Sequence, residues 1–294
     1  MDYVGRIFRP PSEAHSLLLQ VTIGCSHNRC VYCDMYRDKQ FRPKPYEQIE
    51  ADLREAASLA RRGFRSDRVF LCDGDALILS TRKLLEILAG IREHLPWVTR
   101  VGTYGDTRSV GRKSPDELTQ LREAGLSIVY HGMESGDDEV LTMIDKGGTR
   151  AELITTASKL RAAGITHSVI VLLGIGGVTL SEQHARNTAT ALSEMDPPYV
   201  GALTTTIVPG TPLAELAARG EFELPSKFRM LEELRELVGG SEFSDCRFSS
   251  NHASNYLPLR GQLPRDKAAM LGVLDEVIAR GDERLLKPER LRGL

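Results

Sequence analysis

The stretch SLLLQVTIGCSHNRCVYC, residues 16–33, joins an apolar, strand-like run to a polar loop that holds three cysteines. Four residues separate Cys25 from Cys30 and two separate Cys30 from Cys33, while the whole chain has only five cysteines. A loop that directly follows a strand can wrap its backbone around one inorganic centre. The spacing therefore predicts a ligand site at the carboxyl end of the first strand.

The rest of the chain alternates strand-like and helix-like segments. Strands are expected at residues 16–23, 67–73, 100–104, 126–133, 167–174, 199–208 and 245–250. Helices are expected at residues 47–62, 81–95, 114–125, 151–164, 181–195, 225–238 and 264–280. Repeated β-then-α units with short connections favour a parallel sheet. They predict an α/β fold, a partial (β/α)6-type barrel, with a doubly wound sheet as the alternative.

The composition is that of a soluble globular protein. The chain has 294 residues, of which 41% are hydrophobic and 27% charged, enough to bury a large core. A net charge of -2 lacks the basic excess that is typical of nucleic-acid binding, so no nucleic-acid partner is favoured. No apolar run approaches the roughly 20 residues of a membrane span, and the first residues lack a signal-peptide core. These features predict a cytoplasmic protein without a membrane partner.

The cysteine loop allows three interpretations. Buried thiols would need an apolar shelter that the intervening SHNR does not offer. His27 would complete a Cys3His zinc site, although one residue between Cys25 and His27 is a tight spacing. The favoured interpretation is a [4Fe–4S] cluster held by Cys25, Cys30 and Cys33. Three protein ligands leave one iron open to a small molecule.

This loop after a first strand resembles that of the radical S-adenosylmethionine (SAM) superfamily, in a CX4CX2C variant of the family's three-then-two spacing. The resemblance implies that SAM chelates the open iron and is cleaved reductively to a 5′-deoxyadenosyl radical that abstracts hydrogen from substrate. It also implies an electron donor such as flavodoxin or ferredoxin. Tyr32 matches an aromatic position that lies near the adenine in the family; ordinary loop packing would explain it equally.

The end of the second strand extends the resemblance. CDGDA, residues 72–76, stands at the place of the family's Gly-Gly-Glu-Pro turn, whose exposed groups hold the SAM ammonium. Gly74 and Asp75 are therefore implied cofactor contacts, although only Gly74 is identical to the family residue. Asp73 stands where the family has glycine, so which group meets the ammonium stays open. A plain turn that ends the strand is the alternative.

Segments after later strands continue the pattern. GMESGDDEVL (132–141) followed by DKG (145–147) resembles methylthiotransferase-like and oxygen-independent coproporphyrinogen-oxidase-like members. There Glu134 would meet the SAM ribose and Lys146 its carboxylate; a helix cap and a solvated lysine are the alternatives. LGIGG (173–177) is similar to the adenine-binding stretch, where Gly174 and Gly176 would let a flat base approach the backbone. An ordinary turn is the alternative there.

These resemblances, with VPGTPL at 208–213, cover residues 16–215, which we take as the barrel core. Residues 216–294 are expected to form a C-terminal extension, packed on the same domain, that closes the barrel's open side. Its polar segment is either a plain surface loop or a source of substrate contacts from Asn251, His252, Asn255 and Tyr256. Cys72 and Cys246 are isolated, so no second cluster is predicted.

The main hypothesis is thus an oxygen-sensitive radical SAM enzyme with a [4Fe–4S] cluster, SAM and an unidentified small-molecule substrate. A structural zinc-binding (Cys3His) protein without redox catalysis is one alternative. A barrel enzyme of acid–base chemistry, with Glu134 and Asp75 as its working carboxylates, is another.

Overall fold

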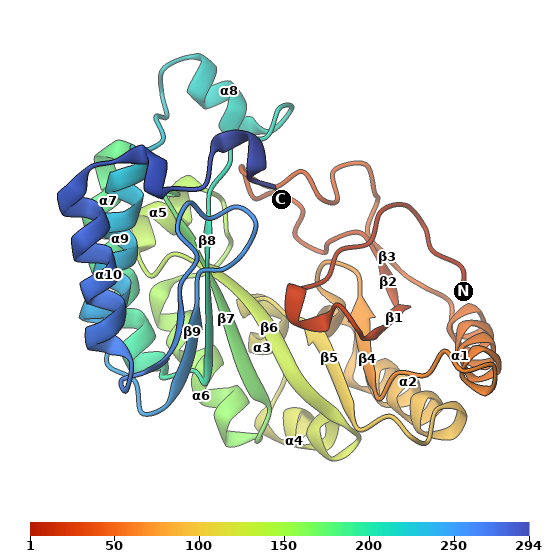
Figure 1. Ribbon diagram of the computed structural model, residues 1–294. Helices are drawn as coiled ribbons and strands as arrows, with labels where there is room; N and C mark the ends of the chain where they lie inside the picture. Colours follow the sequence, from red (N-terminus) through yellow and green to blue (C-terminus); the bar gives the residue numbers. More distant parts are fainter. Residues whose placement is uncertain (294) are drawn as a thin grey trace. The chain divides into compact units, whose positions relative to one another are not determined.

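The computed structural model describes residues 1–293 and contains an eight-stranded, mostly parallel sheet (Figure 1). In spatial order its strands are β1 (Leu17–Gln20), β4 (Arg68–Cys72), β5 (Arg100–Tyr104), β6 (Leu126–Glu134), β7 (Thr166–Leu173), β8 (Tyr199–Thr204), β9 (Cys246–Ser249) and β10 (Arg260–Leu263). β9 runs parallel to β8, whereas β10 is antiparallel to β9. Because β1 and β10 are edge strands, the sheet is open and not a closed barrel.

The order of the strands decides between the two expected topologies. From β1 to β8 the strands of this sheet follow one another in chain order. A doubly wound sheet instead reverses its order partway across. The predicted α/β fold of partial-barrel type is therefore confirmed, and the doubly wound alternative is wrong.

Helices follow most strands of the sheet. They are α1 (Tyr46–Arg61), α2 (Thr81–His94), α3 (Thr107–Gly111), α4 (Pro115–Glu123), α5 (Asp138–Met143), α6 (Arg150–Ala162), α7 (Gly177–Met195), α8 (Pro212–Ala218), α9 (Lys227–Gly240) and α10 (Lys267–Arg280). The start of α4 is a capping box: Ser114 Oγ accepts the Glu117 N–H at 3.1 Å, and Glu117 Oε2 accepts the Ser114 N–H at 2.8 Å. Local sequence thus sets the start of this helix, within one residue of the start expected at residue 114.

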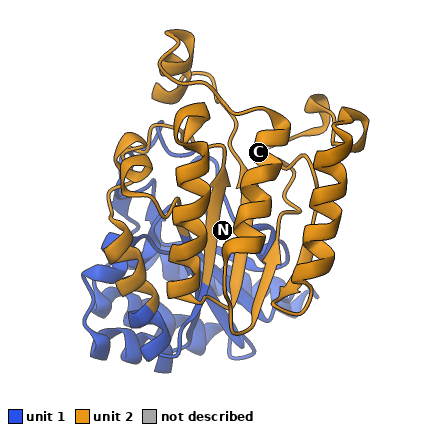
Figure 2. Cartoon of the chain, turned by 90° about the vertical axis from the view of Figure 1, so that its left-hand side faces the viewer, with its two compact units in different colours: residues 1–28, 35–131, 158–167 blue, residues 29–34, 132–157, 168–294 orange. Residues whose placement is uncertain are grey.

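The chain divides into two compact units (Figure 2). Unit 1 comprises residues 1–28, 35–131 and 158–167, and its core packs strand residues such as Leu19 and Leu71 against α2 residues such as Ile87. Unit 2 comprises residues 29–34, 132–157 and 168–294. In unit 2, alternate residues of β7 are buried, and α9 packs against both α7 and α10.

The N-terminal segment contributes a buried acid to unit 1. A 3-10 turn, η1 (Pro11–Glu13), places Glu13 in the interior with 0% of its surface exposed. Glu13 forms an ion pair with Arg100, whose Nη2 lies 2.8 Å from the hydroxyl of Tyr130. A buried carboxylate needs such partners, because an unpaired one is costly.

Some elements differ from the sequence-based expectation. The single strand expected at 16–23 is two strands, since β2 (Thr22–Ile23) leaves β1 to pair with β3 (Arg42–Pro43) in a separate sheet. The strand expected at 199–208 ends at Thr204. The short elements α3, α5, α8 and β10 were not predicted, because a segment of only a few residues is too short to show a clear periodicity. A core boundary at residue 215 stays a prediction.

None of the helices within residues 1–293 combines the length and apolar character that crossing a bilayer requires.

Candidate cofactor site

Cys25 belongs to unit 1, whereas Cys30 and Cys33 belong to unit 2. All three thiols are reduced and partly exposed. In unit 2 the Cys33 N–H donates to the Cys30 carbonyl at 3.2 Å, which closes a tight turn. Val31 within that turn donates to Ile144 at 3.0 Å and accepts from Leu213 at 3.0 Å. The second and third cysteines therefore stand on a backbone that is held in place.

Asp73, directly after β4, anchors the first cysteine in unit 1. Its Oδ2 accepts the N–H of Gly24 at 3.1 Å, and Lys39 Nζ lies 2.9 Å from the same oxygen. Gln20 Nε2 is a third donor to Oδ2, at 3.1 Å. Asp73 is 0% exposed, and within residues 1–293 its Oδ1 has no hydrogen-bond partner. The DGD stretch therefore does more than end a strand, because it fixes the residue before Cys25.

The next two residues also meet the cysteine loop. A Cβ on Gly74 would lie 2.9 Å from Cys25 Cβ and 2.6 Å from the Tyr36 ring, so only glycine fits there. Asp75 accepts the Ser26 hydroxyl at 2.7 Å and the Asp106 N–H at 3.3 Å. Burial, reinforced by the charge of Asp106, raises the pKa of Asp75 to about 6. The structure thus brings both predicted residues of this turn close to the loop.

Three predicted cofactor residues meet in unit 2. Lys146 Nζ lies 3.0 Å from Glu134 Oε1 and 3.5 Å from the Tyr32 hydroxyl. Burial and the neighbouring Glu134 carboxylate raise the pKa of Tyr32 well above its usual value, so the phenol stays protonated. Lys146 is therefore not simply solvated, because it forms an ion pair with Glu134. The Tyr32 hydroxyl lies beside this pair.

The backbone at Glu134 is unusual. This last residue of β6 has φ +64°, a left-handed conformation that a side chain with a Cβ seldom adopts. Strained residues of this kind occur preferentially at functional sites. The cap of α5 is instead Asp137, whose Oδ1 accepts the Val140 N–H at 3.0 Å, so helix capping does not account for Glu134.

The glycine turn after β7 packs closely against its surroundings. Gly174 has φ +80°, and its N–H donates to Glu233 of α9 at 2.6 Å. Gly176 is the N-cap of α7, and a Cβ there would lie 3.1 Å from His184 Cβ. Glycine is thus favoured at position 174 by its backbone conformation, and a side chain at position 176 would make a tight contact.

The C-terminal residues named from sequence play different parts. Asn255 is buried, with its Nδ2 donating to the Ala202 carbonyl at 2.8 Å and its Oδ1 accepting the Thr204 hydroxyl at 2.8 Å, so it binds the carboxyl end of β8, beyond the residues that pair with β9. Tyr256 donates its hydroxyl to Glu289 at 2.9 Å, under the Arg292 guanidinium. His252 Nδ1 accepts the Ser254 N–H at 3.2 Å, and Asn251 is exposed. Their role as substrate contacts stays a prediction.

Several site residues escaped sequence reasoning. Lys39 lies 34 positions before its partner Asp73, and Glu233 lies 59 positions after Gly174, so no local pattern joins them. Ser26 lies within the cysteine loop, but its hydrogen bond to Asp75, 49 positions later, becomes visible only in the folded structure.

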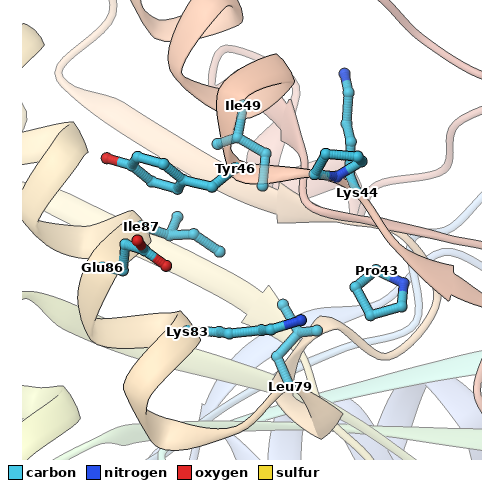
Figure 3. Close-up of a pocket in the computed structure, with 9 residues that line it drawn as sticks. Pro43, Lys44, Tyr46, Ile49, Leu79, Lys83, Glu86 and Ile87 are labelled. Carbon is cyan, nitrogen blue, oxygen red and sulfur yellow. The ribbon is translucent and has the colours of Figure 1, made fainter.

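A separate pocket of about 320 Å³ lies in unit 1, between the start of α1 and α2 (Figure 3). Tyr46 and Ile49 of α1 face Ile87 of α2 across it, whereas Lys44 points away toward Asp52, 2.6 Å from its Nζ. None of the predicted site residues lines it. We therefore do not assign the cofactor site to this pocket.

The donor set fits an iron–sulfur cluster in its chemistry. Within residues 1–293, no three Cys, His, Asp or Glu side chains are already arranged as a metal site. However, three reduced, partly exposed thiols are the ligands that such a cluster takes. The buried oxygen of Asp73 that lacks a hydrogen-bond partner within residues 1–293 also suits a polar ligand beside the loop.

The three thiols that follow the first strand of this open α/β sheet suit a protein of the iron–sulfur class. The model of the Radical SAM superfamily matches residues 19–189, and the chain belongs to this superfamily.

The chain also resembles individual known proteins of this kind. It is similar to the heme chaperone HemW of Bacillus subtilis (strain 168), with 24% identity over 73% of this chain and 56% of the relative. It is also similar to HemW of Mycobacterium tuberculosis (strain ATCC 25618 / H37Rv), with 25% identity over 78% and 59%. The match thus spans less than two thirds of these relatives. The fold resembles that of coproporphyrinogen III oxidase (HemN) from Escherichia coli, with a TM-score of 0.57, 16% identity and coverage of 76% and 51%. The zinc alternative finds no support in these comparisons.

Proposed function

We propose that this protein is a radical SAM enzyme that binds a [4Fe–4S] cluster through Cys25, Cys30 and Cys33. The family match over residues 19–189, which includes all three thiols, is the observation that carries the proposal. When bound, the cluster supplies the electron that breaks a C–S bond of SAM to give a 5′-deoxyadenosyl radical. An electron donor such as flavodoxin or ferredoxin completes the reaction.

The chain's own residues orient the cofactor. Asp75 and the unpartnered oxygen of Asp73 are suited to the SAM ammonium, because a buried carboxylate gains from a cation. Lys146, already beside Glu134, offers a charge to the SAM carboxylate, and Glu134 offers acceptors to the ribose. Tyr32 and the turn at Gly174 and Gly176 would accommodate the adenine.

Anaerobic purification and iron–sulfur reconstitution test the proposal. We expect about four irons per chain, a visible absorption that dithionite bleaches, and cleavage of SAM to 5′-deoxyadenosine. Alanine at Cys25, Cys30 or Cys33 should abolish all three signals. Cys246→Ala is the matched control, because Cys246 is buried in β9 and should leave iron content unchanged. Colourless protein with one zinc per chain would instead favour the Cys3His alternative.

The substrate needs a separate experiment. The name heme chaperone, carried by the relatives, favours heme or a heme-related partner over the small metabolite expected from sequence. Titrating reconstituted protein with hemin should then give a saturable Soret shift at one heme per chain. A linear, non-saturating response would return the small-molecule substrate to first place, to be sought by mass spectrometry of SAM-cleavage products.

A further inference from the structure

Glu233 is a buried carboxylate beneath the glycine turn that follows β7. It lies on α9 with 2% of its surface exposed. Its Oε2 accepts the Gly174 N–H at 2.6 Å, and its Oε1 accepts the Ser181 hydroxyl at 2.6 Å. One acid from the C-terminal third therefore holds both the turn and the first half of α7.

The protons around this carboxylate can be assigned from the hydrogen bonds. Ser181 Oγ accepts from Arg229 Nε at 3.0 Å, so its own proton points to Glu233. His184 Nε2 lies 3.1 Å from the Leu172 carbonyl, which can only accept, so this nitrogen carries a proton that is already used. His184 Nδ1 then accepts from the Ser135 hydroxyl at 2.8 Å. Glu233 thus meets donors at both oxygens, an arrangement that suits the ionised form.

Other residues of the C-terminal third support the same turn. Met230, one helical turn before Glu233, would lie 3.0 Å from a Cβ on Gly174. The Glu223 carbonyl accepts the Val178 N–H at 2.9 Å, and the Phe222 ring would lie 3.0 Å from a Cβ on Gly177. The turn is therefore packed from behind by residues 222–233, beyond the family match that ends at residue 189.

We propose that Glu233 is a positioning residue for SAM: its ionised carboxylate holds the Gly174 amide and so sets the backbone of the turn on which the adenine lies. This inference rests on the proposed function, because it gives the turn the adenine as its ligand. It assigns a task to the C-terminal extension, namely to shape the cofactor site without touching the cofactor.

If Glu233 positions the turn in its ionised form, SAM affinity should depend on pH, which a merely structural role of Glu233 would not cause. Burial raises the pKa of Glu233 to about 7. The titratable and charged groups that face it are His184 of α7, 4.0 Å away, and Arg229 of α9, which acts through Ser181. Arg229 also pairs with Glu232 of its own helix at 2.8 Å. Because burial lowers the pKa of His184 to about 4, this histidine stays neutral where Glu233 titrates.

SAM affinity of the reconstituted holoprotein, measured anaerobically from pH 6 to pH 8, tests the inference. If only the ionised form is competent, the dissociation constant should rise about tenfold between pH 8 and pH 6, in proportion to the lost competent fraction. Glu233→Gln should bind SAM about tenfold more weakly at pH 8 and show no such pH dependence. Glu236→Gln, on the next turn of α9, is the matched control and should behave as wild type.

Two further measurements keep the test decisive. In SAM-free protein, the Gly174 amide should exchange its hydrogen faster in Glu233→Gln than in wild type. Ser181→Ala removes one donor to the carboxylate, so the midpoint of the pH dependence should move upward. Wild-type SAM affinity with an unchanged pH profile in Glu233→Gln would overturn the inference and leave the proposed function intact. Failure of wild-type holoprotein to bind SAM at any pH would overturn both.

Discussion

Lys39 Nζ lies 2.9 Å from Asp73 Oδ2, and their side chains are only 4% and 0% exposed. This buried ion pair fixes the backbone before the first cysteine, because the same Asp73 oxygen also accepts the Gly24 N–H.

Asp73→Asn should destabilise the protein strongly. Removing one partner leaves the Lys39 ammonium buried without its counter-charge, which typically costs about 3–5 kcal/mol. Urea unfolding of the apo protein measures the loss. Glu276→Gln breaks the exposed pair with Arg280 and should change the free energy of unfolding by less than about 0.5 kcal/mol. A cost for Asp73→Asn below about 1 kcal/mol would show that the pair is not what holds the loop.

Gly74→Ala should impair cluster binding more than folding. The added Cβ would meet Cys25 Cβ at 2.9 Å, so the first cysteine must move. We expect a lower iron content after reconstitution and loss of SAM cleavage. Gly272→Ala in α10, where nothing lies within 4 Å of the new Cβ, is the control, and it should stabilise the protein by up to about 1 kcal/mol. Full iron content in Gly74→Ala would contradict the close contact.

Lys146→Met should weaken SAM binding without loss of iron. The ammonium that pairs with Glu134 would be gone, and we expect a dissociation constant about tenfold higher, equivalent to about 1.4 kcal/mol. Isothermal titration of reconstituted protein measures it. The neighbouring Asp145→Asn, which alters an exposed pair with Arg29, should bind as wild type, because asparagine tolerates the left-handed φ of +47° found there. Equal affinity in both variants would remove Lys146 from the site.

Asp75→Asn should make the protein more stable at neutral pH while weakening SAM binding. The folded pKa of Asp75, about 6, lies above its ordinary value of 3.8, so the fold favours the protonated form. This contribution to stability is complete below pH 3.8 and is lost as the pH rises through 6, at a cost of up to about 3 kcal/mol. Asparagine mimics the protonated acid.

The check is urea unfolding of both proteins at low and neutral pH. The gain in free energy of unfolding that Asp75→Asn brings should be large at neutral pH and should disappear as the pH falls toward 4. A constant difference between the two proteins would mean that Asp75 is not the titrating group.

Local sequence was sufficient for long, regular elements and for the cysteine loop. The helices expected at 47–62, 81–95 and 114–125 match α1, α2 and α4 within one or two residues. The three thiols after a strand and the later glycine and glutamate motifs led to the superfamily that the family match confirms. These features are encoded in neighbouring residues, where propensity and spacing act directly.

Contacts between residues that lie far apart in the sequence could not be predicted from local patterns. Only the fold brings Lys39 to Asp73, Glu233 to Gly174 and Asn255 to the carboxyl end of β8. The strand expected at 16–23 divides because Val21 donates its N–H to the Cys72 carbonyl at 2.7 Å while Thr22 and Ile23 pair with β3. Residues 22–23 therefore keep the expected strand conformation, and the fold decides only which strand they pair with.

Glu13 of η1 limits how far the N-terminus of this protein can be shortened. Trimming the chain to residue 19, where the family match begins, would remove Glu13 and leave the half-buried guanidinium of Arg100 and the buried phenol of Tyr130 without this carboxylate. The bounds of the family match are therefore not the bounds of a fragment that would fold. Residues before the match contribute a side chain to the interior of unit 1.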